Sequence, residues 1–110
     1  MLRESVTYVV ARHETWQGAC ATEPVEAGWA TEALFFVRAL VQPTGELPQI
    51  RAQISADGMR WADEGTATSM PADKDSLGVL RVRHFGNWLR LVADLPEDAQ
   101  CVVLVSVHLK

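Results

Sequence analysis

The chain has 110 residues and a formal net charge of −4 at pH 7, with 48% hydrophobic and 22% charged residues. This composition is typical of a globular protein and argues against disorder. The acidic balance disfavours nucleic acid as a partner, because proteins that bind nucleic acid usually carry a basic excess. The length predicts a single domain over 1–110, with a core large enough to fold without a metal or disulfide.

The N-terminal residues carry no targeting pattern. Met1-Leu2-Arg3-Glu4 leads directly into a strand-like run, without the basic and apolar stretches of a secretory signal. The longest apolar run, Cys101–Val105, is far too short to span a membrane. We therefore expect no membrane partner, and a cytoplasmic protein or one assembled into a particle from the cytoplasm.

The first strand is predicted over Ser5–Arg12, which is rich in β-branched residues. The next segment, His13–Thr31, contains Trp16 and Trp29 but no clear period. We interpret it as a loop with room for one short strand. A loop of this length is uncommon in a compact domain unless it binds a ligand, covers an edge or contains an unrecognised element.

Glu32–Gln42 is the most hydrophobic strand candidate. Its alternating positions form one face of Phe35, Val37, Ala39 and Val41 and another of Leu34, Phe36, Arg38 and Leu40. A strand that is apolar on both faces needs a cover on both, which the His13–Thr31 segment or another subunit could supply. A helix is the rival interpretation, and the run of aromatic and β-branched residues favours the strand.

Leu47–Trp61 indicates a β-hairpin. Ile50, Ala52 and Ile54 alternate with polar residues, which is the period-2 pattern of a half-buried strand. Asp57-Gly58 follows, and this dipeptide is typical of a tight hairpin turn because such a turn needs positive φ at its centre. Met59 and Trp61 then resume the apolar alternation on the return strand. The polar segment Asp63–Ser76 is interpreted as a connection.

Three further strands are predicted over Leu77–His84, Trp88–Leu95 and Cys101–Leu109. Their short connections favour antiparallel pairing. On the last strand one face consists of Cys101, Val103, Val105, Val107 and Leu109. Seven or eight short strands with no significant helix predict an all-β fold, specifically an antiparallel β-sandwich of jelly-roll type.

Two stretches resemble a known family. Gln53–Trp61 (Q-I-S-A-D-G-M-R-W) resembles a hairpin of discoidin-like jelly-roll modules, in which an alternating strand ends in Ser-x-Asp-Gly before a Trp. Asn87–Leu91 (N-W-L-R-L) is similar to an aromatic-hydrophobic-Arg-hydrophobic strand of those modules. The resemblance implies a jelly roll that binds sugars or lipid headgroups through its loops. By size and architecture alone, the chain also resembles small phage-type decoration or accessory structural proteins.

Outward positions supply candidates for an interaction surface. Four arginines fall at such positions and would form a basic stripe if their strands share one sheet. Arginine is enriched at interfaces because its planar guanidinium pairs with carboxylates, although an ordinary solvated sheet face is the alternative. Trp88 is out of phase with the inward residues of its strand. The interface candidates are Leu34, Phe36, Arg51, Arg81, Arg83, Trp88 and Arg90.

Four tryptophans in a chain of this size suggest a second kind of site. An exposed aromatic ring can stack on a sugar or anchor an interface, whereas a loop tryptophan can also fold onto the core. The candidates for carbohydrate binding are Trp16, Trp29 and Trp88.

No catalytic constellation is evident. Nucleophilic catalysis needs a nucleophile beside an oriented base, and no local signature links the three histidines with Cys20 or Cys101. Both cysteines are expected to be free thiols in a reducing compartment. The acidic turns lack the spacing of a dedicated calcium loop, and no Cys/His spacing suggests zinc. We therefore expect no enzyme, no metal and no cofactor.

Two functions fit these features best. The first is a non-catalytic structural or interaction protein that self-associates, as a homo-oligomer or an accessory subunit of a larger assembly. The two apolar faces of Glu32–Gln42 and the outward Val92, Val102 and Leu104 favour it. The second is a small carbohydrate-binding module of jelly-roll type. A small enzyme would need a cleft holding a titratable pair with shifted pKa values.

Overall fold

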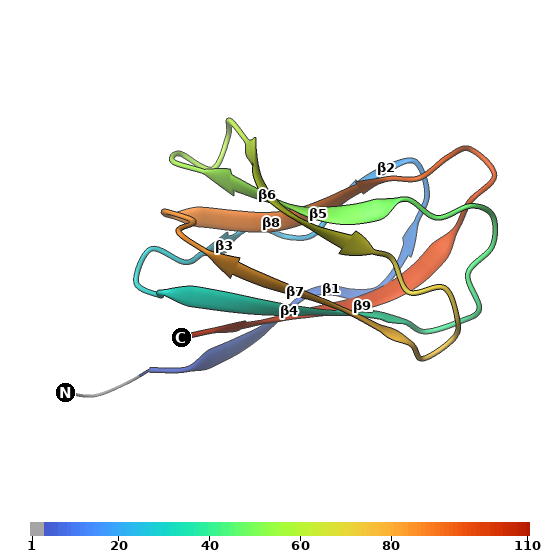
Figure 1. The fold of residues 1–110 in the computed structure, drawn as a ribbon, viewed down its shortest axis with the longest axis horizontal. Helices are drawn as coiled ribbons and strands as arrows, with labels where there is room; N and C mark the ends of the chain where they lie inside the picture. The colour runs from blue at the N-terminus through green and yellow to red at the C-terminus, as the bar shows by residue number, and fades with distance from the viewer. Residues whose placement is uncertain (1–3) are drawn as a thin grey trace.

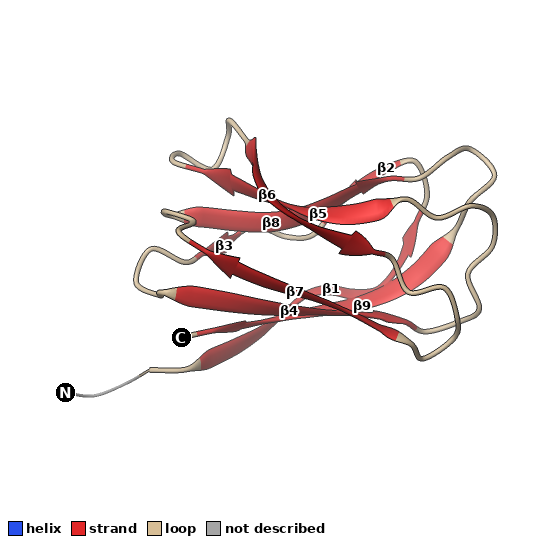
Figure 2. Cartoon of the chain, in the orientation of Figure 1, coloured by secondary structure: helices blue, strands red, loops and turns tan. Residues whose placement is uncertain are grey.

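The computed structural model describes residues 4–110. Met1, Leu2 and Arg3, which belong to the N-terminal run considered above for a targeting signal, lie outside the described residues. Within that range the chain forms nine strands and no helix (Figure 2). The strands make two antiparallel sheets that lie one above the other (Figure 1). The predicted all-β class is therefore confirmed, and the number of strands exceeds the seven or eight expected.

The first sheet has the strand order β1-β9-β4-β7. The second has the order β2-β8-β5-β6, and the short strand β3 also pairs with β8. The strand bounds are β1 Val6–Trp16, β2 Ala19–Ala21, β3 Val25–Glu26, β4 Glu32–Ala39, β5 Gln49–Ser55, β6 Ala62–Ser69, β7 Leu77–Arg83, β8 Trp88–Asp94 and β9 Cys101–Leu109.

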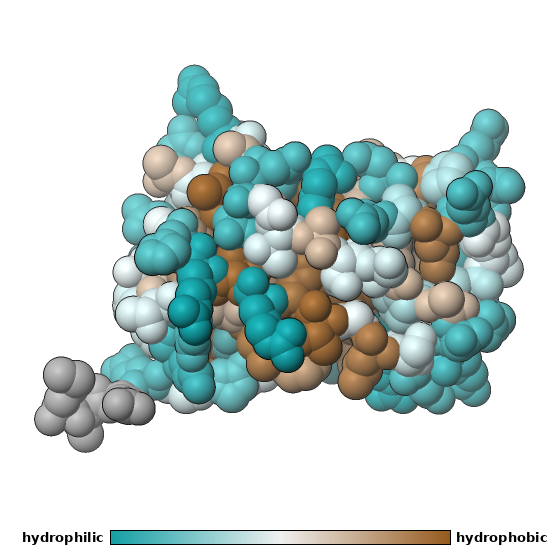
Figure 3. Space-filling view, in the orientation of Figure 1, coloured by the Kyte–Doolittle hydropathy of each residue, from teal (hydrophilic) through white to brown (hydrophobic). Residues whose placement is uncertain are grey.

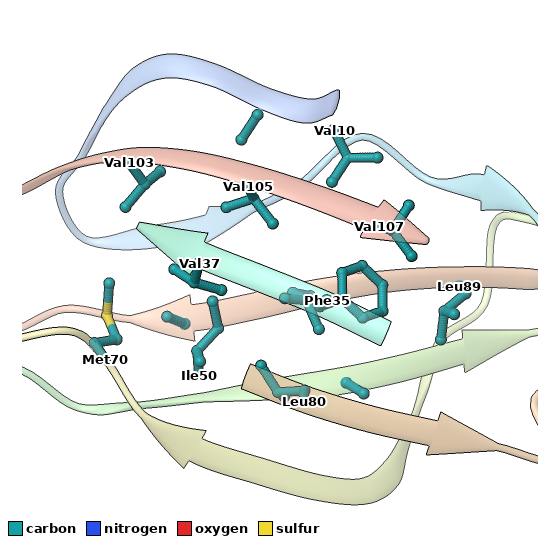
Figure 4. Close-up of a cluster of buried hydrophobic side chains, with 14 of the residues drawn as sticks. Val10, Phe35, Val37, Ile50, Met70, Leu80, Leu89, Val103, Val105 and Val107 are labelled. Carbon is teal, nitrogen blue, oxygen red and sulfur yellow. The ribbon is translucent and has the colours of Figure 1, made fainter. Parts of the chain in front are cut away.

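The hydrophobic core lies between the two sheets and follows from the period-2 alternation of the strands. On β9 every second side chain is buried, and on β4 Phe35 and Val37 are completely buried. They meet Ile50, Leu80 and Leu89 from β5, β7 and β8 (Figure 4). Residues of the two sheets thus bury one another, which removes both inner faces from water.

The central strand of the first sheet is β4, which pairs with β7 on one side and β9 on the other. The strand interpretation of this run is confirmed and the helix is excluded. The strand ends at Ala39, three residues before the predicted end at Gln42. Val41 therefore lies outside the strand and is 46% exposed rather than facing the core.

The interpretation of His13–Thr31 as a loop with room for one short strand was only partly right. Strand β1 continues to Trp16, and β2 and β3 pair with β8. Two register shifts interrupt β1, and His13 has a φ of 50°. Bulges of this kind break the alternation of side chains, so the period-2 pattern that identifies a strand is lost.

The interpretation of Asp63–Ser76 as a connection was wrong, because its first half belongs to β6. This strand forms an edge of the second sheet and pairs only with β5. All its side chains are exposed or half-buried, so it has no apolar face to detect. Polar composition is expected at a sheet edge, where exposed apolar strands invite aggregation.

The hairpin of β5 and β6 is present, but its turn spans residues 56–61 and is longer than the tight turn expected. The Ser55 hydroxyl accepts hydrogen bonds from the amides of Asp57 and Gly58, at 3.3 and 2.9 Å. The Asp57 carboxylate accepts the amides of Met59 and Arg60, each at 2.9 Å. Met59 therefore lies in the turn, where it is 75% exposed, rather than on the return strand.

Replacing Phe35 by alanine should destabilise the protein by about 3–5 kcal/mol, because the substitution leaves a cavity in the tightly packed core. The free energy of unfolding is measured by urea titration. Val41→Ala, at an exposed position on the same segment, should change it by less than about 0.5 kcal/mol. Equal losses for the two variants would contradict the assignment of the inner face.

The hydrogen bonds in the turn lower the pKa of Asp57 from 3.8 to about 2, chiefly through the amides of Arg60 and Met59. A depressed folded-state pKa stabilises the protein above the unfolded value, and this stabilisation is lost as the pH falls through the folded value. We therefore expect the difference in melting temperature between the wild type and Asp57→Ala to shrink between about pH 4 and pH 2. A difference that stays constant across this range would disprove the role of the carboxylate.

Candidate functional site

The outer face of the first sheet carries an unusual number of apolar side chains. Strands β4, β7 and β9 bury every second residue against the core and present the alternate residues on the opposite side, and β1 adds Val9 beside β9. These alternate residues are half-buried or exposed. We call the following set the apolar face: Val9, Leu34, Phe36, Leu77, Val79, Val102 and Leu104.

The strand register places the apolar residues of neighbouring strands in adjacent rows, with Ser106 and Arg38 among them. Phe36 lies opposite Val79 on β7 and Ser106 on β9, and Val9 on β1 pairs with the same Ser106. In the next row Arg38 lies between Leu77 and Leu104. In Figure 3 hydrophobic residues gather over the region where β4 and β7 lie, between hydrophilic side chains. Monomeric proteins rarely expose large contiguous apolar patches, so such a patch indicates an interaction site.

The His13–Thr31 segment does not cover this face. Its strands β2 and β3 pair with β8 in the opposite sheet, so they lie on the other side of the core from the outer surface of β4. The sequence allowed two covers for the outer face of β4, namely the His13–Thr31 segment or another subunit. Among the described residues the first is therefore excluded. The outer side of Phe36 remains only half-buried within the chain.

A cationic hollow adjoins the apolar face where β4 begins and β7 and β9 end. It has a volume of about 710 Å³, and Leu34, Arg81, Arg83 and Lys110 are among its lining residues. Glu32 forms ion pairs with both Lys110 and Arg83, at 3.3 and 3.7 Å. Arg81 forms no ion pair with any described residue and is exposed. This end of the sheet therefore presents excess positive charge.

The opposite end of the same face carries a different ion pair. Arg38 donates from Nε and Nη2 to one carboxylate oxygen of Asp75, at 3.1 and 2.8 Å. These hydrogen bonds lower the pKa of Asp75. Because the Asp75 amide also donates to the carbonyl of Ala39, the carboxylate is fixed beside the end of β4. The spacing of the two residues in sequence gave no signal for this pair.

The four predicted arginines do not form one basic stripe. Arg81 and Arg83 lie on β7 in the first sheet, whereas Arg51 and Arg90 lie on β5 and β8 in the second. Trp88 also lies on β8. The structure thus brings together Leu34, Phe36, Arg81 and Arg83 on one sheet and separates them from the other three interface candidates. A local sequence pattern does not reveal strand order. The sequence alone therefore could not decide whether the strands that carry these arginines share one sheet.

The outer face of the second sheet is an internally paired polar network. Arg51 donates to Asp63 at 3.2 Å and to Asp94 at 3.1 Å, and the hydrogen bond to Asp94 is the largest cause of its raised pKa. Arg90 donates twice to Gln53, at 3.0 and 2.7 Å, and lies 4.1 Å from the ring centre of Trp61. These side chains already have partners within the chain, so they offer less to another protein than the apolar face does.

The three tryptophan candidates have different environments. Trp16 is buried in the core, and Trp88 packs with its ring beside Gly58 of the hairpin turn. Only Trp29 is largely exposed, at 44%. It lines a hollow of about 400 Å³ together with Tyr8, which is equally exposed, and Glu26. Sequence reasoning missed Tyr8 because it lies in a strand, where an aromatic residue is ordinarily assigned to packing.

Both cysteines are free, and burial raises the pKa of each thiol. A raised pKa reduces the thiolate fraction and therefore the nucleophilicity at neutral pH. Among residues 4–110, no three His, Cys, Asp or Glu side chains converge as metal ligands. In the same range no helix has the length and apolar character needed to cross a membrane.

Comparisons of the chain with protein-family models, with curated proteins and with solved structures found no match.

Proposed function

We propose that this protein is a non-catalytic structural or interaction protein that self-associates through its apolar face, as a homo-oligomer or as a subunit of a larger assembly. The observation that carries the proposal is Phe36, a large aromatic side chain at the centre of a sheet surface that no described segment covers. Aromatic residues are enriched at the buried cores of interfaces.

The contrast between the two sheets supports this proposal. The outer face of the second sheet consists of ion pairs and hydrogen bonds that are complete within the chain, such as Arg51 with Asp63 and Asp94. The outer face of the first sheet instead carries apolar side chains on neighbouring strands, such as Phe36 beside Val79. Removing apolar surface from water favours association by about 25 cal/mol for each Å², before the entropic cost of joining two chains is subtracted.

We also assign the fold to the jelly-roll type. The strand orders β1-β9-β4-β7 and β2-β8-β5-β6 support this assignment, because successive strands pass between the two facing sheets except at the β5–β6 hairpin and the β2–β3 segment. Jelly rolls are common in capsid and lectin domains. The similarity to small decoration or accessory proteins is an analogy at the level of fold, so the function rests on the surface itself.

The test is the mass of the protein in solution, measured by light scattering over a range of concentrations. We expect the wild type to form a defined oligomer of the 12.1 kDa chain. Phe36→Lys should raise the dissociation constant of this oligomer about 100-fold. The matched control is Met59→Lys, which introduces the same charge at an exposed apolar residue of the hairpin turn. A wild type that is monomeric at every concentration would refute self-association.

A second candidate function is carbohydrate binding, which the pairing of Trp29 with Tyr8 favours. Two exposed aromatic rings in one hollow can stack on a sugar ring, and Glu26 can accept hydrogen bonds from its hydroxyls. We expect any glycan detected by calorimetry to lose at least about tenfold in affinity on Trp29→Ala, and to be unaffected by Trp88→Phe. Absence of binding to the wild type across a glycan panel would eliminate this function.

A further inference from the structure

We infer that two copies of this chain pack apolar face to apolar face with their strands reversed, so that the cationic end of each copy lies on the acidic end of the other. This inference rests on the self-association proposed above and adds the orientation of the second copy. It follows from the distribution of charge at the two ends of the first sheet.

The cationic end is formed where β7 and β9 end. Arg81 and Arg83 are both exposed, and Lys110 follows β9 directly. Glu32 is the carboxylate that pairs with two of these cations, Arg83 and Lys110. With histidines neutral, these four side chains carry a net charge of +2, and Glu64, which also lines the hollow, lowers it to +1. The hollow of about 710 Å³ between them can accept a protruding acidic segment.

The acidic end is formed by the turns that precede β7 and β9. Both strands pair antiparallel with β4, so they run in the same direction and their starts lie at one end of the sheet (Figure 1). The turn before β7 contains Asp73, Lys74 and Asp75, and the turn before β9 contains Glu97 and Asp98. With Arg38 included, this end carries a net charge of −2.

Two-fold symmetry allows two face-to-face arrangements of such a sheet. If the strands of both copies run in the same direction, the cationic end faces another cationic end and the acidic ends also face each other. If the strands are reversed, both contacts join opposite charges. Like charges placed across an interface oppose association, so the reversed arrangement is favoured.

The size of the face is consistent with a second copy as its occupant. Four strands spaced about 4.8 Å apart and about eight residues long give a projected area of about 500 Å². A standard interface buries about 800 Å² on each partner, and the turns at both ends would add to the apolar centre. A two-fold contact of the whole face therefore approaches the size of a stable interface.

The experiment uses charge reversal at exposed residues. One variant combines Arg81→Glu with Arg83→Glu, and the other combines Asp73→Lys with Asp98→Lys. Each variant alone should weaken dimerisation at least tenfold in analytical ultracentrifugation, because both contacts of its dimer then join like charges. The chain that carries all four substitutions should regain affinity to within a few-fold of the wild type, since every contact again joins opposite charges.

Recovery in the fourfold variant also excludes misfolding as the cause of the earlier losses. A wild type that dimerises through Phe36 but is insensitive to both reversals would overturn the reversed orientation and leave the proposed function standing. Loss of affinity without recovery in the fourfold variant would overturn it as well. A wild type that remains monomeric would overturn the orientation and the proposed function together.

Discussion

The structure depends on the burial of one face of β4 and β9 against the second sheet. These two strands lie at the centre of the first sheet, and their inward residues, such as Phe35 and Val105, are completely removed from water. Because side chains alternate strictly along a strand, a shift by one residue would exchange the inner and outer faces. The register is therefore fixed by hydrophobic burial, and β1 and β7 pair with this centre on its two sides.

The same alternation places the second apolar set of β4 on the outside. Phe36 and Leu34 cannot reach the core while their neighbours occupy it, and β7 and β9 add Val79 and Leu104 beside them. The core thus determines which residues of these strands point outward, but it does not require those residues to be hydrophobic. A polar residue at each of these positions would preserve the fold equally well, so their hydrophobic character calls for an explanation at the level of association.

The two outer surfaces show how charge can be used differently on one fold. On the second sheet, arginine and aspartate alternate across neighbouring strands, as Arg51 does with Asp63 and Asp94, and their charges are compensated locally. On the first sheet, charge is concentrated at the two ends and the centre is apolar. Charges that are paired within the chain favour a surface that stays in water. Opposite charges at the two ends of a surface favour one orientation of a partner over the other.

The sequence by itself determined the all-β class, the identity of β4 as a strand, and the inward residues of β8 and β9, because regular alternation is a local property of neighbouring residues. It did not predict β6, which has no apolar face, or the full length of β1, where bulges disrupt the alternation. Only the tertiary structure decided which strands share a sheet. That decision separated Arg81 from Arg51 and placed Tyr8 near Trp29, because strand order depends on contacts between residues far apart in the chain.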